Sequence, residues 1–71
     1  MQINERIREA RKNAGITQRQ AGEALGTTQQ QYGKYETGQQ EMTTSRFKAF
    51  CEICNCSADW ILGIGESSIE N

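Results

Sequence analysis

The sequence predicts an all-α domain built from five short helices. Three observations lead to this fold class: apolar residues recur at helical spacing, polar residues that can cap a helix precede these runs, and glycines follow several of them. No strand-like alternation of any length is present. With 71 residues, the chain is one domain near the lower size limit for a self-sufficient core. We expect the domain to span residues 1–63 and a flexible C-terminal tail to span residues 64–71.

The first helix is expected over about residues 2–14. Its apolar side chains recur every three or four positions, at Ile3, Ile7, Ala10 and Ala14. Gly15 then occupies the left-handed position that commonly follows a helix. These features predict an amphipathic helix with one buried face.

The second helix is expected to begin at Gln18, because Thr17 and Gln20 form a capping box of the S/T-x-x-E/Q type. Its apolar face is thin and consists of Ala21, Ala24 and Leu25. Gly22 lies inside the helix, where glycine costs about 1 kcal/mol relative to alanine unless another segment packs closely there. Gly26 supplies the turn that follows.

Thr28 and Gln31 repeat the capping box and start a third helix, which Gly38 ends. Tyr32 and Tyr35 should point inward. The outer face should carry Gln29, Gln30, Gly33 and Lys34. Two short helices joined by a glycine turn, the second rich in side chains that can read base edges, are the sequence form of a helix-turn-helix. We therefore expect the chain to bind duplex DNA.

A fourth helix is expected from about Thr44 to Cys54, and Asn55 can take the left-handed position after it. Its apolar stripe is formed by Phe47, Phe50, Cys51 and Cys54. Ser57 should cap a short fifth helix over residues 58–62, which contains Trp60, Ile61 and Leu62.

The net charge of −1 hides an asymmetry along the chain. Residues 1–49 carry all eight basic residues against five glutamates, whereas residues 50–71 carry four acidic residues and no basic one. The basic part coincides with the expected DNA-binding helices, although a mixed solvated surface would look the same. Because the N-terminus lacks a signal peptide and no run of about 18 apolar residues occurs, we expect a soluble cytoplasmic protein.

The sequence offers no catalytic or metal site. Histidine is absent, and no nucleophile–base arrangement is present, so we expect neither an enzyme nor a cofactor. The cysteines at C-x-x-C-x-C are Cys51, Cys54 and Cys56. A structural zinc site needs four ligands, so we interpret these thiols as small core residues, with redox sensing as a lesser alternative.

Residues 5–62 resemble the Cro/repressor-type helix-turn-helix family, the lambda repressor-like DNA-binding modules of phages and bacteria (XRE family). The resemblance rests on ERIREARKNAGITQ, ALGTTQQ, YETG and NCSADWILG. It implies a compact five-helix fold and sequence-specific binding to an operator, usually as a homodimer. The implied role is transcriptional regulation, most often repression, of a phage, prophage or bacterial type. The alternative is an antitoxin-like module whose main partner is a protein and which autoregulates its own operon.

By this resemblance, Gln29 and Gln30 contact base edges from the first turn of the recognition helix. The chemistry agrees, because a glutamine amide matches the adjacent donor and acceptor of adenine in the major groove. Glutamine is also simply a good exposed helix former. Lys34, one turn along, could equally contact a guanine edge or a phosphate.

The family also places a glutamine like Gln18 against a phosphate at the start of the second helix, where it supports the first recognition glutamine. Weaker phosphate candidates, which a solvated surface would resemble, are Thr17, Arg11, Arg19, Thr28, Gln31, Thr37, Gln39 and Gln40.

Arg11 and Glu36 are expected to form a partly buried ion pair, as in related repressors. At the other end of the chain, the family fold implies that Trp60, Ile61 and Ile64 lie near a dimer interface. Trp60 could instead cap the core of its own domain. Gly33 has no evident structural reason and should loosen the recognition helix by about 1 kcal/mol.

Overall fold

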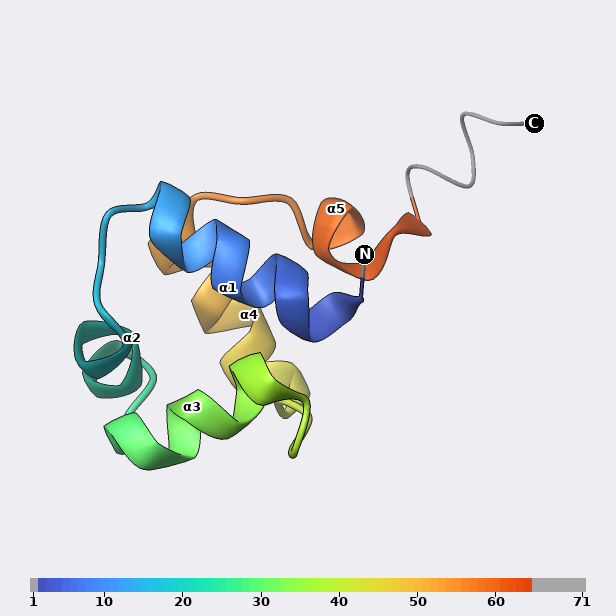
Figure 1. Cartoon of the computed structure of the whole chain (residues 1–71). Helices are drawn as coiled ribbons and strands as arrows, with labels where there is room; N and C mark the ends of the chain where they lie inside the picture. Colours follow the sequence, from blue (N-terminus) through green and yellow to red (C-terminus); the bar gives the residue numbers. More distant parts are fainter. Residues whose placement is uncertain (1, 65–71) are drawn as a thin grey trace.

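The computed structural model describes residues 2–64 and shows an all-α fold in that part of the chain, which confirms the predicted fold class. The helices are α1 (Ile3–Asn13), α2 (Gln18–Ala24), α3 (Gln29–Thr37), α4 (Thr44–Cys54) and α5 (Ala58–Leu62). In Figure 1, α2 and α3 form one edge of the molecule, α1 crosses in front of α4, and α5 lies beside the N-terminal end of α1. The expected flexible tail falls, from residue 65 on, outside the described residues.

Hydroxyl side chains fix where four of the helices begin. The side chains of Thr17, Thr28, Thr43 and Ser57 each accept a hydrogen bond from the backbone N–H three residues later. Such caps satisfy amides that have no partner within the helix. The reciprocal half of the capping box is present at Thr17, where the Gln20 side chain accepts from the Thr17 N–H at 2.8 Å.

The second predicted capping box is only half formed. The Gln31 backbone N–H donates to the Thr28 hydroxyl at 3.1 Å, but the Gln31 side-chain amide instead donates to Gln40. The reason is the loop after α3, which Gly38 turns back with a left-handed φ of 81°. Gln31 therefore ties the start of α3 to this loop rather than closing the cap.

The core is centred on aromatic rings that come from α3 and α4. Tyr32 and Phe50 are fully buried and stack with their ring centroids 6.3 Å apart, while Tyr35 meets Tyr32 edge to face at 6.1 Å. Ala21 on α2 is also fully buried. A small residue on α2 and a large ring on α3 thus share one buried region, in line with the tolerance of cores for swaps that conserve volume. This packing fixes α3 from its inner side.

The predicted apolar stripe of α1 is partly wrong. Ile3 is 48% exposed and Ala14 is exposed, whereas Arg6 is buried together with Ile7 and Ala10. Arg6 is drawn inward because its guanidinium lies over the Trp60 ring at 5.3 Å and donates to the Trp60 carbonyl. The long methylene stem of arginine permits this burial.

Gly22 marks the closest approach of α2 to the start of α3. A Cβ at this position would lie 2.8 Å from the carbonyl oxygen of Thr28 and 3.2 Å from the backbone nitrogen of Gln29. Glycine in this helix interior is therefore required by the helix-turn-helix packing. Ala24, which was expected on the same buried face, is exposed because α2 is short and only Ala21, Gly22 and the capping Leu25 turn inward.

Candidate functional site

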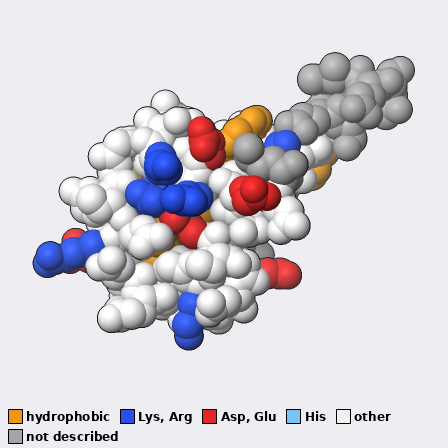
Figure 2. Space-filling model, in the orientation of Figure 1, with side chains coloured by type: hydrophobic (Ala, Val, Ile, Leu, Met, Phe, Trp, Pro, Cys, Tyr) orange, Lys and Arg blue, Asp and Glu red, His pale blue; other side chains and the backbone are white. Residues whose placement is uncertain are grey.

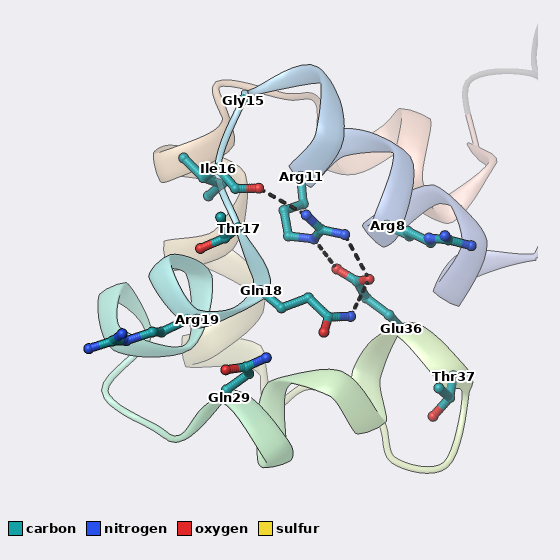
Figure 3. A pocket seen from close by; sticks show the side chains of 10 residues that line it. All are labelled: Arg8, Arg11, Gly15, Ile16, Thr17, Gln18, Arg19, Gln29, Glu36 and Thr37. Atoms are coloured by element: carbon teal, nitrogen blue, oxygen red, sulfur yellow. Dashed lines mark hydrogen bonds and ion pairs between the residues drawn. The ribbon is translucent and has the colours of Figure 1, made fainter.

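An open hollow lies between the C-terminal end of α1, the start of α2 and the outer edge of α3 (Figure 3). The residues around it differ in charge and come from all three segments. They are Arg8, Arg11, Gly15, Ile16, Thr17, Gln18, Arg19, Gln29, Glu36 and Thr37. Seven of the candidate site residues named in the sequence analysis therefore meet at one surface feature.

An ion pair between Arg11 and Glu36 crosses this hollow. The Arg11 Nε lies 2.6 Å from the Glu36 Oε2, and the Arg11 Nη2 lies 3.3 Å from the Glu36 Oε1. The side chains are only 13% and 2% exposed. Arg11 also donates through Nη1 to the Ile16 carbonyl at 2.9 Å. One guanidinium thus connects α1, the segment before α2, and the end of α3.

The hydrogen bonds at Glu36 stabilise its ionised form. Burial alone would raise the pKa of this carboxyl, but hydrogen bonds from Arg11 and from neighbouring groups, including Gln18, hold the pKa below its usual range. The same pair raises the pKa of Arg11 through the hydrogen bond to Glu36. Tyr32 lies next to this pair, and burial raises the pKa of its phenol. Arg11 and Glu36 are therefore both charged at neutral pH and form a largely buried ion pair.

Gln18 takes part in this ion-pair network, a role that sequence reasoning did not predict for it. Its Nε2 donates to the Glu36 Oε1 at 3.0 Å. Figure 3 shows the Gln18 side chain between the ion pair and Gln29, which extends from α3 toward α2. Gln18 thereby links the ion pair to the region of Gln29. Its expected contact with a phosphate stays a prediction.

The outer face of α3 carries the three candidate base-contacting residues. Gln29, Gln30 and Lys34 are exposed, while Tyr32 and Glu36 are buried on the opposite side. Figure 2 shows that Lys and Arg side chains gather over α1 on this face, with a carboxylate beneath them, whereas the surface around α3 is mostly uncharged. The outer face of α3 is therefore polar, with Lys34 as its charged residue, and lies beside the basic side chains of α1.

The remaining phosphate candidates differ in how far their side chains are already engaged. Arg19 is accessible, since its side chain is 76% exposed and its pairing with Glu23, at 3.6 Å, is loose. The Thr17 and Thr28 hydroxyls accept the capping bonds described above, and the Thr37 hydroxyl donates to the Lys34 carbonyl at 3.3 Å. Gln39 and Gln40 are exposed in the loop after α3.

Two arginines contribute to the site in ways that the sequence analysis missed. Arg8 lines the hollow together with Arg11, one helical turn along α1. Their spacing of three residues was the signal that could have identified Arg8 as part of the same face. Arg46 on α4 donates to the Tyr35 hydroxyl at 2.9 Å and so connects α4 to the recognition helix.

The predicted interface residues at the C-terminal end separate into two groups. Ile61 is 1% exposed and belongs to the core of its own domain, so its assignment to a dimer surface is wrong. The fifth helix is short, and its inward side is occupied by this residue. Trp60 and Ile64 are 37% and 55% exposed. The Arg6 guanidinium lies over the Trp60 ring, so the ring contacts a cation of its own domain.

The three cysteines lie close to one another at the end of α4. Cys54 is buried, and Cys51 and Cys56 are half-buried. Burial raises the pKa of both Cys51 and Cys54 to about 11, which keeps the thiols protonated and poorly reactive at neutral pH. Within residues 2–64, no group of three Cys, Asp or Glu side chains is placed to hold a metal ion.

No helix between residues 2 and 64 is both long and apolar enough to cross a lipid bilayer.

Curated relatives of this chain are bacterial regulators. The chain is 32% identical over 71 residues to the HTH-type transcriptional regulator ImmR of Bacillus subtilis (strain 168), covering all of this chain and 56% of that protein. It is 38% identical over 60 residues to the HTH-type transcriptional regulator DicA of Escherichia coli (strain K12), covering 84% and 44% of the two chains. The chain thus spans about half the length of the curated relatives it matches.

A solved structure shows the same fold. The P22 c2 repressor protein, crystallised in complex with synthetic operator 9T, superposes with a TM-score of 0.79 at 27% sequence identity. The match covers 87% of this chain and 94% of that chain. Residues 7–61 also match the family described as Helix-turn-helix, over the segment that contains α2, α3 and the hollow. With its capped α2–α3 pair, glycine turn and repressor-like fold, this chain belongs to the helix-turn-helix family.

Proposed function

We propose that this chain binds double-stranded DNA sequence-specifically, with α3 in the major groove, and acts as a transcriptional regulator of the phage or bacterial repressor type. One observation carries the proposal: α3 exposes Gln29, Gln30 and Lys34 on one face while its other face is locked into the core. A rigid helix that presents polar side chains of this kind matches the docking geometry of helix-turn-helix proteins. The P22 c2 repressor, which has the same fold, was crystallised with a synthetic operator, and this supports DNA binding by the present chain.

Base contacts follow from the chemistry of the exposed side chains. The amides of Gln29 and Gln30 each offer a donor beside an acceptor, which pairs with N6 and N7 of adenine. Lys34 donates to a guanine edge or to a phosphate of the same groove. The Arg11–Glu36 pair sets the direction of α3 relative to α1, so it acts on DNA through the placement of this helix.

Phosphate contacts come from the rim of the hollow. Arg8 and Arg19 supply charge there, together with the polar side chains of Thr17 and Gln18. The number of basic groups is small, so the dependence of affinity on salt should be shallow compared with that of strongly basic DNA-binding proteins. Specificity should therefore depend mainly on the face of α3.

We further propose that two copies bind together. Trp60 and Ile64 are exposed, and Trp60 belongs to α5, which lies at the far end of the molecule from α2 (Figure 1), where a second copy could cover it. A two-fold dimer would place two recognition helices about 34 Å apart along the duplex. The antitoxin-like alternative is not favoured, because the relatives are named as transcriptional regulators. A regulator of this kind would act in the cytoplasm.

Substitution of Gln29 tests the proposal. Gln29→Ala should cost about 1–3 kcal/mol of binding at one base position per half-site and relax the preference there. Lys34→Gln should weaken binding more than Lys48→Gln, a matched loss of an exposed cation on α4. Affinities of each variant for a selected operator and for its single-base variants, at fixed salt, decide the matter. If Gln29→Ala weakens binding to every sequence equally, α3 does not read bases through Gln29.

A further inference from the structure

Almost every glycine in the described part of the chain is explained by the fold. Four of them have a positive φ at helix ends or turns, which disfavours any residue with a side chain: Gly15, Gly26, Gly38 and Gly63. Gly22 is required by the close approach of α2 and α3. Among residues 2–64, Gly33 is the only glycine that has neither a positive φ nor a close neighbour that would exclude a side chain.

Gly33 lies in the interior of α3, and a Cβ built on it would meet nothing within 4 Å. Alanine would therefore fit without moving any neighbour. Glycine in a helix interior is less favourable than alanine because it loses more backbone freedom on folding. The chain thus carries a destabilising residue at a position where its own packing does not demand one.

The position of Gly33 on α3 indicates which surface of the helix lacks a side chain. Residues four apart lie on the same face of a helix, so Gln29, Gly33 and Thr37 form one row along α3. Gln29 and Thr37 both line the hollow, and Gln30 and Lys34 flank the row on its exposed side. Gly33 is therefore a notch without a side chain in the middle of the face that carries the candidate base contacts.

We propose that Gly33 is a positioning residue that lets the surface of the DNA lie directly against the backbone of α3. This inference rests on the proposed function. The amides of Gln29 and Gln30 must reach base edges at hydrogen-bond distance, and such bonds weaken steeply outside a narrow range. A methyl group at the centre of the face would hold the helix away from the groove. The partner surface at the notch is a C–H surface, from a thymine methyl group or a deoxyribose.

The test measures folding stability and DNA affinity in the same variant. Gly33→Ala should raise the ratio of folded to unfolded protein about fivefold, the equivalent of the roughly 1 kcal/mol by which alanine exceeds glycine in a helix. The same variant should bind the selected operator at least tenfold more weakly, while its affinity for unrelated duplex DNA changes little. Gly33→Ser, of similar size but polar, should show the same loss of operator binding.

Asn55→Gly is the control variant. Asn55 has a left-handed φ of 51° at the end of α4, where glycine is the preferred residue, so the change alters stability through the backbone alone. It should leave operator affinity unchanged. If Gly33→Ala gains stability and keeps its full operator affinity, the inference is overturned. A loss of stability in Gly33→Ala would also overturn it, since the notch would then serve the fold.

Failure of the inference can be distinguished from failure of the proposed function. If the wild-type chain selects no DNA sequence, both fail; if it selects one and Gly33→Ala binds it equally well, only the inference fails. Replacement of each thymine in the operator by uracil removes only the methyl group and identifies the partner at the notch. If uracil at one position weakens binding of the wild type but not of Gly33→Ala, the contact is with the methyl group of that thymine. If no position behaves in this way, the contact is with the deoxyribose.

Discussion

Replacement of Glu36 by alanine should strongly destabilise the fold, because it leaves the largely buried Arg11 guanidinium without its partner. Glu36 accepts two hydrogen bonds from Arg11, at 2.6 and 3.3 Å, and one from Gln18 at 3.0 Å. In Glu36→Ala, the Arg11 side chain, which is 13% exposed in the wild-type structure, would lose its counter-charge. Removing one partner of a buried ion pair costs about 3–5 kcal/mol. A domain of this size has a total stability of about the same amount, so much of the variant should be unfolded at 25 °C.

Urea unfolding followed by circular dichroism measures this loss through the midpoint and the slope of the transition. Glu23→Ala is the matched control, because it removes a carboxylate from the pair with Arg19, in which both side chains are more than half exposed. That change should cost about 0–1 kcal/mol. The double variant Arg11→Met/Glu36→Leu should recover most of the lost stability, since two apolar groups leave no charge unpaired. Equal losses in Glu36→Ala and Glu23→Ala would refute the reasoning.

Three further predictions follow from the same structure. The fold stabilises the ionised form of Glu36, so the contribution of this carboxylate to folding stability is complete above its ordinary pKa of 4.5 and should be lost as the pH falls through its lower pKa in the folded state. The urea midpoint should therefore fall less steeply from pH 7 to pH 3 in Glu36→Gln than in the wild type. Parallel curves for the two proteins would contradict this assignment. Gly22→Ala should destabilise the fold by about 1–3 kcal/mol despite the better helix propensity of alanine, because the added methyl group would meet the Thr28 carbonyl. An unchanged thermal midpoint would show that α2 and α3 can move apart. Cys51 and Cys54, with pKa values of about 11, should react slowly with iodoacetamide at pH 7.5. The rate of alkylation should rise about tenfold per pH unit up to pH 10. Fast alkylation of the folded protein would mean that the thiols are not buried as described.

The helices themselves were predictable because their signals are local. The Thr17, Thr28 and Ser57 caps act on the amide three residues later, and Gly38 and Asn55 end their helices by their own backbone conformation. Each of these features is complete within a few residues of sequence. For this reason, the predicted starts of α2, α4 and α5 agree with the structure to the residue.

Side-chain placement between helices was less predictable, because it depends on partners far away in the sequence. Arg6 is buried through Trp60, which lies 54 residues later, and Gln18 is oriented by Glu36, which lies 18 residues later. Helical periodicity contains no information on either partner. Ile61 was assigned to an interface because the family fold implies one near this helix. The sequence pattern offered no correction, since five residues are too few to distinguish an inward from an outward face.

The pairing of Arg11 with Glu36 came from family resemblance, since spacing alone does not connect residues 25 positions apart. The structure adds the reason for the pair, which is that α1 and α3 meet there around a shared hollow (Figure 3). The base-contacting roles of Gln29, Gln30 and Lys34 stay predictions.

Selection of bound duplexes from a random DNA pool, at two salt concentrations, tests sequence-specific binding most directly. Reading by α3 in a dimer predicts enrichment of an inverted repeat whose half-sites lie about one helical turn apart, at both salt concentrations. The enriched bases should then change when Gln29, Gln30 or Lys34 is substituted. No enrichment, with weak binding that disappears at the higher salt concentration, would contradict the account and reduce the DNA contact to a nonspecific basic surface.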